Sequence, residues 1–252
     1  MGILDFPAHA LVRFFQNHHL MSANGQHQWY TVKGGSIEYV RRLQQSLTAR
    51  GVDIRLAAPI AAVKREAGAV LVRPVGGEWE MFDDVVFATH SDQTLRLLAD
   101  PSPAERAALG AVRYQPNQAI LHRDPSVMPK NRKCWASWAY VEPRGGAGGR
   151  IDLSYWMNSL QPIPKDDPIF VTLNSNGGIR DDLIDDVVTF EHPVYDLAAL
   201  AAQDTIRSMN GIRNTWFAGA WLRNGFHEDG FASAVDVVEA MRSGARERQL
   251  AA

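Results

Sequence analysis

Two uninterrupted apolar runs, far apart in the chain, constrain the fold more than any other sequence feature. The first is Val85–Thr89 (VVFAT), and the second is Thr215–Gly219 (TWFAG). Short apolar runs without polar alternation are typical of strands that are buried on both faces, as in a parallel sheet. The long stretch between the two runs has a different pattern of residues. We therefore expect an α/β domain whose two halves are separated by a second domain.

The residues around the first run alternate between helix and strand patterns. Ile37, Val40 and Leu43 recur at helical spacing behind a plausible N-cap at Ser36, and Gly51 ends that helix. Further helices are predicted at Ala8–Gln16, from Asp92 as the N-cap through Leu98, and at Pro103–Leu109, and strands at Val52–Leu56, Ala62–Lys64 and Ala69–Arg73.

From Tyr114 to His192 prolines and turn residues are frequent, which is typical of a mostly antiparallel sheet. A glycine-rich stretch, RGGAGGR at 144–150, is predicted to be a loop. A helical pattern of residues reappears at Asp196–Met209, and a last helix is predicted at about Asp229–Met241. The strands expected in this block are Gln118–His122, Trp135–Tyr140, Ile151–Met157, Ile169–Leu173 and Val187–His192.

Composition excludes several classes of protein. The chain has 252 residues, 46% of them hydrophobic, which is enough to bury a core. A formal net charge of -2 does not favour nucleic acid as a partner. No apolar run approaches the ~20 residues that span a membrane, and the N-terminus has no secretory pattern. With Cys134 as the only cysteine, a cytoplasmic location is expected.

The segment Trp216–Ser233 (WFAGAWLRNGFHEDGFAS) carries the most chemical information. A buried strand ends at Gly219 and a helix opens near Asp229, so a helix N-terminus is expected at the carboxyl edge of the sheet. Ligands of open α/β sheets bind there, and the helix N-terminus favours an anionic or electron-rich group. Gly225 and Gly230 would let the backbone approach a flat ring. An ordinary strand–loop–helix with a capping Asp229 explains the pattern as well, so both interpretations stay open.

This segment resembles the C-terminal flavin-contacting motif of flavin-containing amine oxidases and related FAD/NAD-binding proteins. More narrowly, the chain is similar to a bacterial group of predicted NAD/FAD-binding oxidoreductases that are often linked to cyclopropane fatty-acid synthesis. The matching stretches cover nearly the whole chain. They are NHHL at 17–20, WYTVKGGSIEYV at 29–40, MPKNRKCWASW at 128–138, YWMNSLQ at 155–161, VTLN at 171–174, HPVYD at 192–196 and WFAGAW…GFHEDG at 216–230.

The resemblance implies an α/β plus α+β fold, with an incomplete Rossmann-like FAD/NAD(P)-binding domain interrupted by a mostly antiparallel substrate-type domain. The expected boundaries are an N-terminal segment at 1–28, the FAD-binding part at 29–100 and 211–252, and the substrate-type domain at 101–210. The implied cofactor is FAD. The residues expected nearest to it are Gly219, Gly225, Phe226, His227, Glu228, Asp229 and Gly230, with His227 facing the flavin. The strand near Ile60–Val63 resembles the one that meets the FAD adenine, although a plain meander explains it equally.

Two departures from the family pattern qualify this interpretation. Members of the family open with a strand, G-x-G-x-x-G and a helix that cradles the FAD pyrophosphate, and this chain has no such motif. Many amine oxidases also carry an acidic residue where this chain has Ala220. Because the absent strands would lie in the centre of the sheet, Val52–Leu56 and Val85–Thr89 are expected to lose neighbours. We therefore expect a chain that self-associates, pairs with a chain carrying the missing segment, or is only marginally stable.

The sequence leaves three functions open and does not decide whether the chain alone is an enzyme. The first is the C-terminal portion of a FAD-dependent, amine-oxidase-like oxidoreductase that acts on a small amine or lipid-like substrate. The second is a truncated or split-subunit protein that does not hold FAD alone and is not catalytic. The third is a lipid-binding module that uses an aromatic pocket. No catalytic base is identified.

Other candidate sites are weaker. His9, His18, His19 and His27 match no familiar metal spacing, so a loose polar segment is expected and no metal site is predicted. No G-x-S-x-G elbow of a hydrolase is present. Cys134 follows Lys133, but a buried place in a strand is the more usual fate of a lone cysteine. Aromatic residues on the middle strands would line an apolar pocket or pack in a core, namely Trp135, Trp138, Tyr140, Tyr155 and Trp156.

Overall fold

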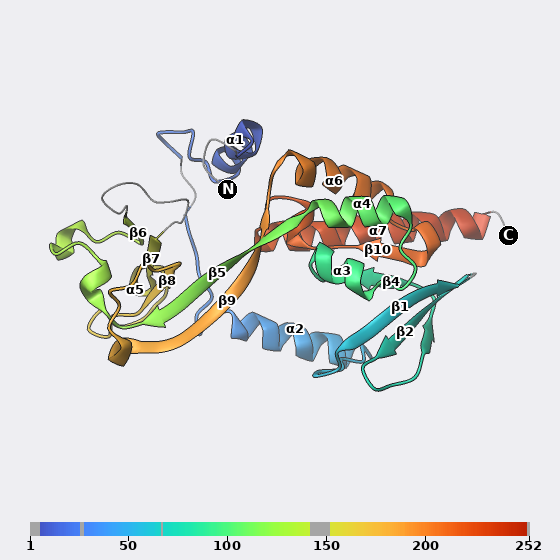
Figure 1. Cartoon of the computed structure of the whole chain (residues 1–252), viewed down its shortest axis with the longest axis horizontal. Helices are drawn as coiled ribbons and strands as arrows, with labels where there is room; N and C mark the ends of the chain where they lie inside the picture. The colour runs from blue at the N-terminus through green and yellow to red at the C-terminus, as the bar shows by residue number, and fades with distance from the viewer. Residues whose placement is uncertain (1–5, 26–27, 67, 142–151, 251–252) are drawn as a thin grey trace.

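A computed structural model describes residues 6–25, 28–66, 68–141 and 152–250, and within it the chain is elongated (Figure 1). Two long antiparallel strands, β5 (Arg113–His122) and β9 (Ile184–Val194), form a ribbon that joins two parts of the molecule. One end of the ribbon belongs to a five-stranded sheet. The other end leads into helices and into two smaller sheets.

The two apolar runs form adjacent parallel strands, as the sequence predicts. They are β4 (Val85–Phe87) and β10 (Thr215–Phe217), and Val86 lies opposite Trp216. All three residues of β10 are buried. The expectation that the first run is buried on both faces is wrong for Val86, which is 45% exposed. Its exposure is consistent with the sheet, because β4 pairs only with β10 among the described residues.

A three-stranded antiparallel meander precedes β4, and this confirms the predicted strands. Its strands are β1 (Ile60–Glu66), β2 (Ala69–Pro74) and β3 (Glu80–Phe82). The strand predicted at Val52–Leu56 is not formed, although its side chains alternate as in a strand. Its apolar side chains are exposed, and Arg55 bonds to Glu80 instead. An alternating segment becomes a strand only if a neighbour satisfies its backbone groups, and the structure places none beside it.

The middle of the chain forms an antiparallel sheet in the order β6-β7-β8-β5-β9, which confirms the mostly antiparallel sheet predicted for this block. The remaining strands are β6 (Trp138–Val141), β7 (Asp152–Trp156) and β8 (Phe170–Leu173), and the short helix α5 (Met157–Leu160) follows β7. Pro116 is tolerated in β5 because β8 pairs only with positions 119–122 of that strand. The predicted loop at 144–150 lies outside the described residues.

Three helices cover the meander and the parallel pair and enclose the main core. They are α3 (Ser91–Leu97), α4 (Pro103–Ala111) and α6 (Leu197–Ser208). Their buried side chains meet Phe87, Phe217 and Trp221 in one cluster. Ser102 and Asp196 accept backbone N–H groups as N-caps of α4 and α6. The N-cap of α3 is His90, so Asp92, which the sequence suggested, lies in the first turn instead.

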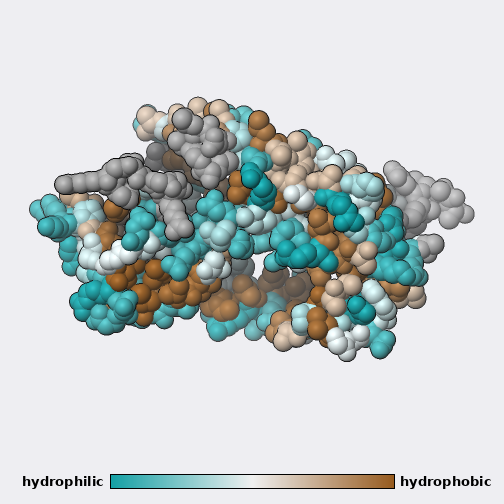
Figure 2. Space-filling model, viewed as in Figure 1, coloured by the Kyte–Doolittle hydropathy of each residue, from teal (hydrophilic) through white to brown (hydrophobic). Residues whose placement is uncertain are grey.

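Three further helices are α1 (Ala8–Asn17), α2 (Ile37–Ala49) and α7 (His227–Leu250), and Val237 of α7 is buried against Trp216 and Ala218. The last is longer than predicted, and it starts two residues earlier. Helix α2 is amphipathic but buries none of its residues. In Figure 1 it lies beneath the β5–β9 ribbon, and its Tyr39 ring lies 6.4 Å from the ring of His227 at the start of α7. Figure 2 shows apolar residues around the opening in this region. Among the described residues, no helix is long and apolar enough to cross a membrane.

Candidate functional site

The carboxyl ends of β4 and β10 lie side by side and are tied together by two hydrogen bonds. The Ala218 backbone N–H donates to the Phe87 carbonyl at 2.9 Å. The indole Nε1 of Trp221 donates to the Thr89 carbonyl at 3.0 Å. Trp221 is buried, so its ring also closes the core beneath this edge. The edge is therefore a rigid platform, at the position where α/β sheets bind ligands.

Gly219 and Gly230, both predicted at the site, are connected through one buried side chain. The Gly219 N–H donates to Ser233 Oγ at 2.8 Å, and that hydroxyl donates to the Gly230 carbonyl at 2.7 Å. Gly219 has φ +149, and a Cβ there would lie 2.7 Å from the Trp221 indole nitrogen. Gly219 is therefore required by the fold of the chain itself.

Gly230 has no comparable internal reason to be glycine. It lies in the first turn of α7, and a Cβ there would meet Ala220 only at ordinary van der Waals distance, 3.6 Å or more. Alanine would fit, and it favours a helix by about 1 kcal/mol over glycine. Glycine at this position therefore leaves room at the helix start that the described chain does not itself use.

The loop between β10 and α7 is held by side chains from α6. Gln203 Nε2 donates to the carbonyls of Trp221 and Arg223 at 2.9 and 2.7 Å. Arg207 donates to the Leu222 carbonyl at 3.2 Å. Arg223 in turn pairs with Asp236 of α7 at 2.7 Å. These bonds satisfy the carbonyls of a tight turn and fix the height of the loop above the sheet edge.

Gly225 packs closely against Tyr195, a residue outside the loop. It has φ +93, and a Cβ on it would lie 2.7 Å from Tyr195 Oη. That hydroxyl is buried and has no hydrogen-bond partner among the described residues. Burial raises the pKa of the Tyr195 phenol, so the group stays protonated over the physiological range. It is an unused polar group directly behind the predicted site.

The N-terminus of α7 presents free backbone donors at this edge. Asp229 Oδ2 accepts the Phe226 N–H at 3.0 Å, and Asn224 donates to Asp229 Oδ1 at 3.3 Å. Asp229 is thus a helix cap, as the simpler interpretation of the sequence proposed. The N–H groups of His227 and Glu228 have no acceptor in the described parts of the chain. Together with the helix dipole they favour an electron-rich group here.

Aromatic rings from the N-terminal segment gather over the start of α7. Phe226 lies 6.0 Å from Phe14 and 4.9 Å from His18, measured between ring centroids. His18 stacks on Trp29 at 6.1 Å. A largely apolar cavity of about 300 Å³ lies here, walled by α1, Tyr195 and Phe226. Helix α1 and the residues after it therefore belong to the surroundings of the site.

The structure brings most of the predicted site residues to one edge but gives them different roles. Gly219, Gly225 and Asp229 serve the loop itself, while His227 and Glu228 are exposed at the helix start. Sequence reasoning missed Tyr195 and α1, because their contacts with the motif are non-local. It also gave no role to Ser233, although this residue lies within the segment Trp216–Ser233. HPVYD at 192–196, which contains Tyr195, was noted only as part of the resemblance.

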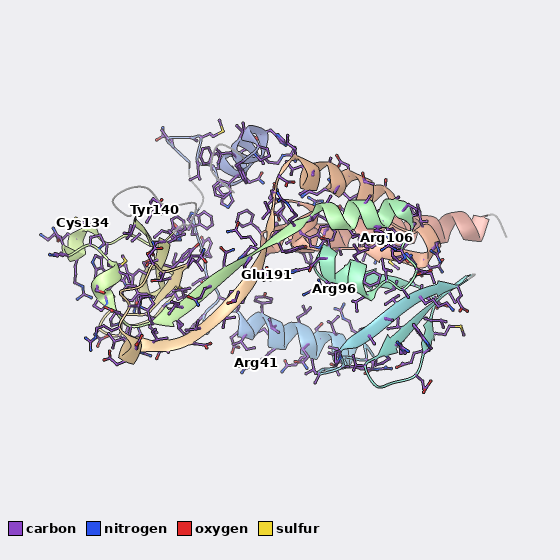
Figure 3. The ribbon with its side chains drawn as sticks, in the orientation of Figure 1. Arg41, Arg96, Arg106, Cys134, Tyr140 and Glu191 are labelled. Carbon is purple, nitrogen blue, oxygen red and sulfur yellow. The ribbon has the colours of Figure 1, made fainter. Side chains whose placement is uncertain are left out.

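Other sequence candidates lie elsewhere. In the parts of the chain that the structure describes, no three histidine, cysteine or acidic side chains gather as a metal site. Cys134 is exposed, so the expectation of a buried strand position is wrong; it lies in a 3-10 turn, far from the motif (Figure 3). Trp135 packs against Trp156 at 5.1 Å and Phe170 at 5.8 Å.

The arrangement fits one end of a flavin but offers no cradle for a dinucleotide pyrophosphate. The exposed N–H groups of α7 and the spare room at Gly230 suit the electron-rich edge of a flat ring. The sequence lacks the G-x-G-x-x-G loop that holds a pyrophosphate in this kind of fold. The described donors and the room at Gly230 are thus compatible with one part of a FAD site.

Comparisons with known proteins agree with this geometry. The family model described as flavin containing amine oxidoreductase matches residues 3–227. Among solved structures, an A394C mutant of putrescine oxidase has a TM-score of 0.54 at 16% identity, covering 84% of this chain and 52% of that one. Reduced UDP-galactopyranose mutase has a TM-score of 0.51 at 12% identity, covering 79% and 50%. No curated protein sequence matches the chain.

These likenesses show a mixed α/β fold of the kind found in FAD-dependent oxidoreductases. The chain spans about half the length of the solved structures that it matches. FAD is the cofactor to which the family and the fold point. Because the family model extends over most of the sequence, the chain belongs to the flavin-containing amine oxidoreductase family.

Proposed function

We propose that this chain forms the flavin-edge and substrate-side part of a FAD-dependent, amine-oxidase-like oxidoreductase that acts on a small amine or lipid-like molecule. The observation that carries the proposal is the α7 N-terminus, with its free N–H groups, at the joint carboxyl edge of β4 and β10. Residues 29–100 and 211–252 would form the FAD-binding part, and residues 101–210 the substrate side, in a cytoplasmic enzyme.

When bound, FAD would supply the acceptor for a hydride from the substrate. The residues of this chain would bind and orient it. The N–H groups of His227 and Glu228 would donate to its electron-rich edge, and the helix dipole would favour negative charge there. Gly230 would allow close approach of the ring. Ser233 and Tyr195 would support the loop from behind.

The first test is the visible absorption spectrum of the purified chain, before and after incubation with excess FAD and desalting. Retained flavin bands would mean that the chain forms a flavin site, and substrate screening would follow. A colourless protein would contradict the proposal for the chain alone. It would favour a requirement for the pyrophosphate-binding segment.

A substitution at the helix start tests the position of the flavin. In flavin titrations, His227→Asn should weaken FAD binding by roughly 1 kcal/mol, or about fivefold, because it changes a side chain that we place beside the ring. His227 is exposed, so folding should be unaffected. His9→Asn is the matched control, because His9 is also an exposed helical histidine but lies on α1. Equal FAD affinities for both variants would contradict the placement of the flavin at α7.

A second candidate is a split or truncated protein that holds FAD only together with another polypeptide segment. The observation that favours it is the absence of any buried residue in α2, together with the exposed side chains of 52–56. We propose that a segment carrying the G-x-G-x-x-G fingerprint covers this region. Adding such a segment in trans, with FAD, should restore retained flavin absorption. If it does not, this candidate fails.

A further inference from the structure

A second cavity of about 1010 Å³ lies between residues 29–33 and the β6–α5 end of the five-stranded sheet. Ligand sites in proteins commonly have volumes of ~300–1,000 Å³, so this cavity is at the upper end of that range. Three large aromatic side chains contribute to its walls: Trp29, Tyr30 and Trp138. They are 67%, 88% and 59% exposed, so the fold leaves their rings uncovered. Exposed rings of this size, gathered at one cavity, indicate a ligand surface.

The remaining walls are chemically simple. Met157, Leu160 and Pro162 extend the apolar surface, and the other lining residues are neutral polar ones with a single exception. The exception is Lys33, and none of the described residues that line the cavity carries a carboxylate. Within the described residues the Lys33 ammonium group forms no ion pair. A cationic ligand would therefore meet the like charge of Lys33, whereas an anionic head group would meet an ionic partner there.

Ring contacts connect this cavity to the proposed flavin edge. Trp29, on the cavity wall, stacks on His18, and His18 lies edge-on to Phe226 at the start of α7. Among the aromatic side chains that the sequence suggested for a pocket, Trp138 lines this cavity, whereas Trp135 and Trp156 pack against each other. The cavity is thus a neighbour of the flavin motif through the N-terminal segment.

We propose that this cavity binds a single-chain amphiphile with an anionic head group. The alkyl chain would lie against the aromatic rings and Leu160, and the head group would lie at Lys33. If this amphiphile is the substrate of the oxidoreductase, the inference rests on the proposed function. The substrate is then an acid and not an amine. The binding itself requires no flavin, so the two proposals can fail separately.

Calorimetric titration of the full chain with dodecanoate and with dodecylammonium, both below their micellar concentrations, tests the charge preference. Dodecanoate should bind, and dodecylammonium should bind at least fivefold more weakly. Decanoate should bind about tenfold more weakly than dodecanoate, because each buried methylene changes affinity by roughly three- to fourfold. Equal binding of the acid and the amine would overturn the proposal.

Substitutions at Lys33 locate the head group. Lys33→Gln should weaken dodecanoate binding about fivefold, the upper range for an exposed charge pair, and Lys33→Arg should retain it. Lys64→Gln is the control, because Lys64 is also exposed but lies on β1 and pairs with Glu66. Trp138→Ala should weaken dodecanoate and decanoate alike. Dodecanoate binding that is unchanged in Lys33→Gln would overturn the assignment.

The same head-group chemistry is present on free fatty acids and on anionic membranes, and vesicle sedimentation separates them. With phosphatidylglycerol vesicles, the chain should stay in the supernatant. If the chain sediments with vesicles but does not bind monomeric dodecanoate, the cavity site is overturned and a membrane contact is indicated instead. Dodecanoate binding by a chain that retains no FAD would leave this proposal standing while the proposed oxidoreductase fails.

Discussion

Glycine at position 225 meets two independent requirements, a left-handed backbone and contact with a phenol. A Cβ at this position would lie 2.7 Å from Tyr195 Oη. Gly225→Ala should therefore cost more than the ~1–2 kcal/mol of a left-handed residue alone, as measured by urea unfolding. The second variant Gly225→Ala/Tyr195→Phe, which removes the crowding hydroxyl, should recover the excess.

Gly177 supplies the matched control. Its φ of +95 is close to that of Gly225, but a Cβ there would meet nothing within 4 Å. Gly177→Ala should show only the backbone cost. Equal losses of stability in Gly177→Ala and Gly225→Ala would mean that contact with Tyr195 does not constrain the loop.

A buried polar network links three strands of the large sheet through His122. Its Nε2 lies 2.7 Å from Thr172 Oγ1, which in turn lies 2.7 Å from Ser154 Oγ. The Asp124 N–H donates to His122 Nδ1 at 3.2 Å, so this nitrogen accepts and the ring is neutral. Burial lowers the pKa of His122 below its ordinary 6.5, although Asp124 opposes the shift. The network contains a serine and a histidine, but both side chains are closed to solvent, so the Ser154 hydroxyl is not available as a nucleophile.

The depressed pKa of His122 predicts a loss of stability in acid. Below about pH 6.5 the unfolded chain takes up a proton at this histidine and the folded chain does not, so unfolding becomes more favourable as pH falls toward the folded pKa. His122→Gln should cost about 1–3 kcal/mol at pH 7, because the network loses its geometry. It should also flatten the pH dependence of urea midpoints below pH 6.5. An unchanged slope would show that other groups cause the acid loss.

At the scale of elements, a buried arginine joins the meander to the helices. The side chain of Arg65, on β1, is fully buried. It donates to Glu105 at the start of α4 and to Asp100 in the preceding loop, each at 3.0 Å. Arg213, beside β10, also pairs with Asp100 and donates to the Arg65 carbonyl at 3.1 Å. The cluster fixes three segments that are distant in sequence.

Removing one partner of this cluster should be costly. Glu105→Gln should lower the free energy of unfolding by about 3–5 kcal/mol, because it leaves the buried Arg65 charge with less compensation. Arg65→Met/Glu105→Leu should recover part of the loss. Lys64→Met is the control on the same strand, because it breaks an exposed pair with Glu66 and should change stability little. A loss no larger in Glu105→Gln than in Lys64→Met would contradict a structural role.

The elements that sequence reasoning found are those whose signals are local. The meander, the antiparallel block and the helix beginning at Pro103 follow from alternation, turns and caps, and the structure forms all of them. The pattern at Val52–Leu56 is equally regular, yet no strand forms. A hydrophobic pattern specifies which face of a segment is apolar, but it does not supply the neighbour that pairs with it.

In the candidate site, too, local features were predictable from the sequence and non-local contacts were not. Gly219 and the start of α7 were predictable because the motif WFAGAW…GFHEDG is contiguous in sequence. The contact of Tyr195 with Gly225 and of His18 with Phe226 depends on how distant segments fold together. No spacing rule in a single sequence encodes such contacts. Gly230 remains the one predicted glycine at the site that the chain's own packing does not explain.

At the scale of the whole molecule, the most unusual feature is an apolar surface on two consecutive segments. Helix α2 exposes Ile37, Val40 and Leu43 at helical spacing, and the extended residues that follow expose Val52, Ile54 and Leu56. Both segments have the pattern of elements that pack against something. Soluble monomers rarely leave such a surface uncovered, and apolar surfaces of this kind mark interaction sites.

We therefore predict that the isolated chain self-associates through this surface or is only marginally stable. Light scattering after size exclusion should give a mass above that of one chain, falling toward one chain in Leu43→Gln/Leu56→Gln. Leu197→Gln is the control, because Leu197 is 70% exposed, much like Leu56 at 76%, but lies at the start of α6. A stable wild-type monomer would contradict self-association. Such a monomer with a high urea midpoint would also show that α2 needs no partner, which would remove the physical argument for a covering segment.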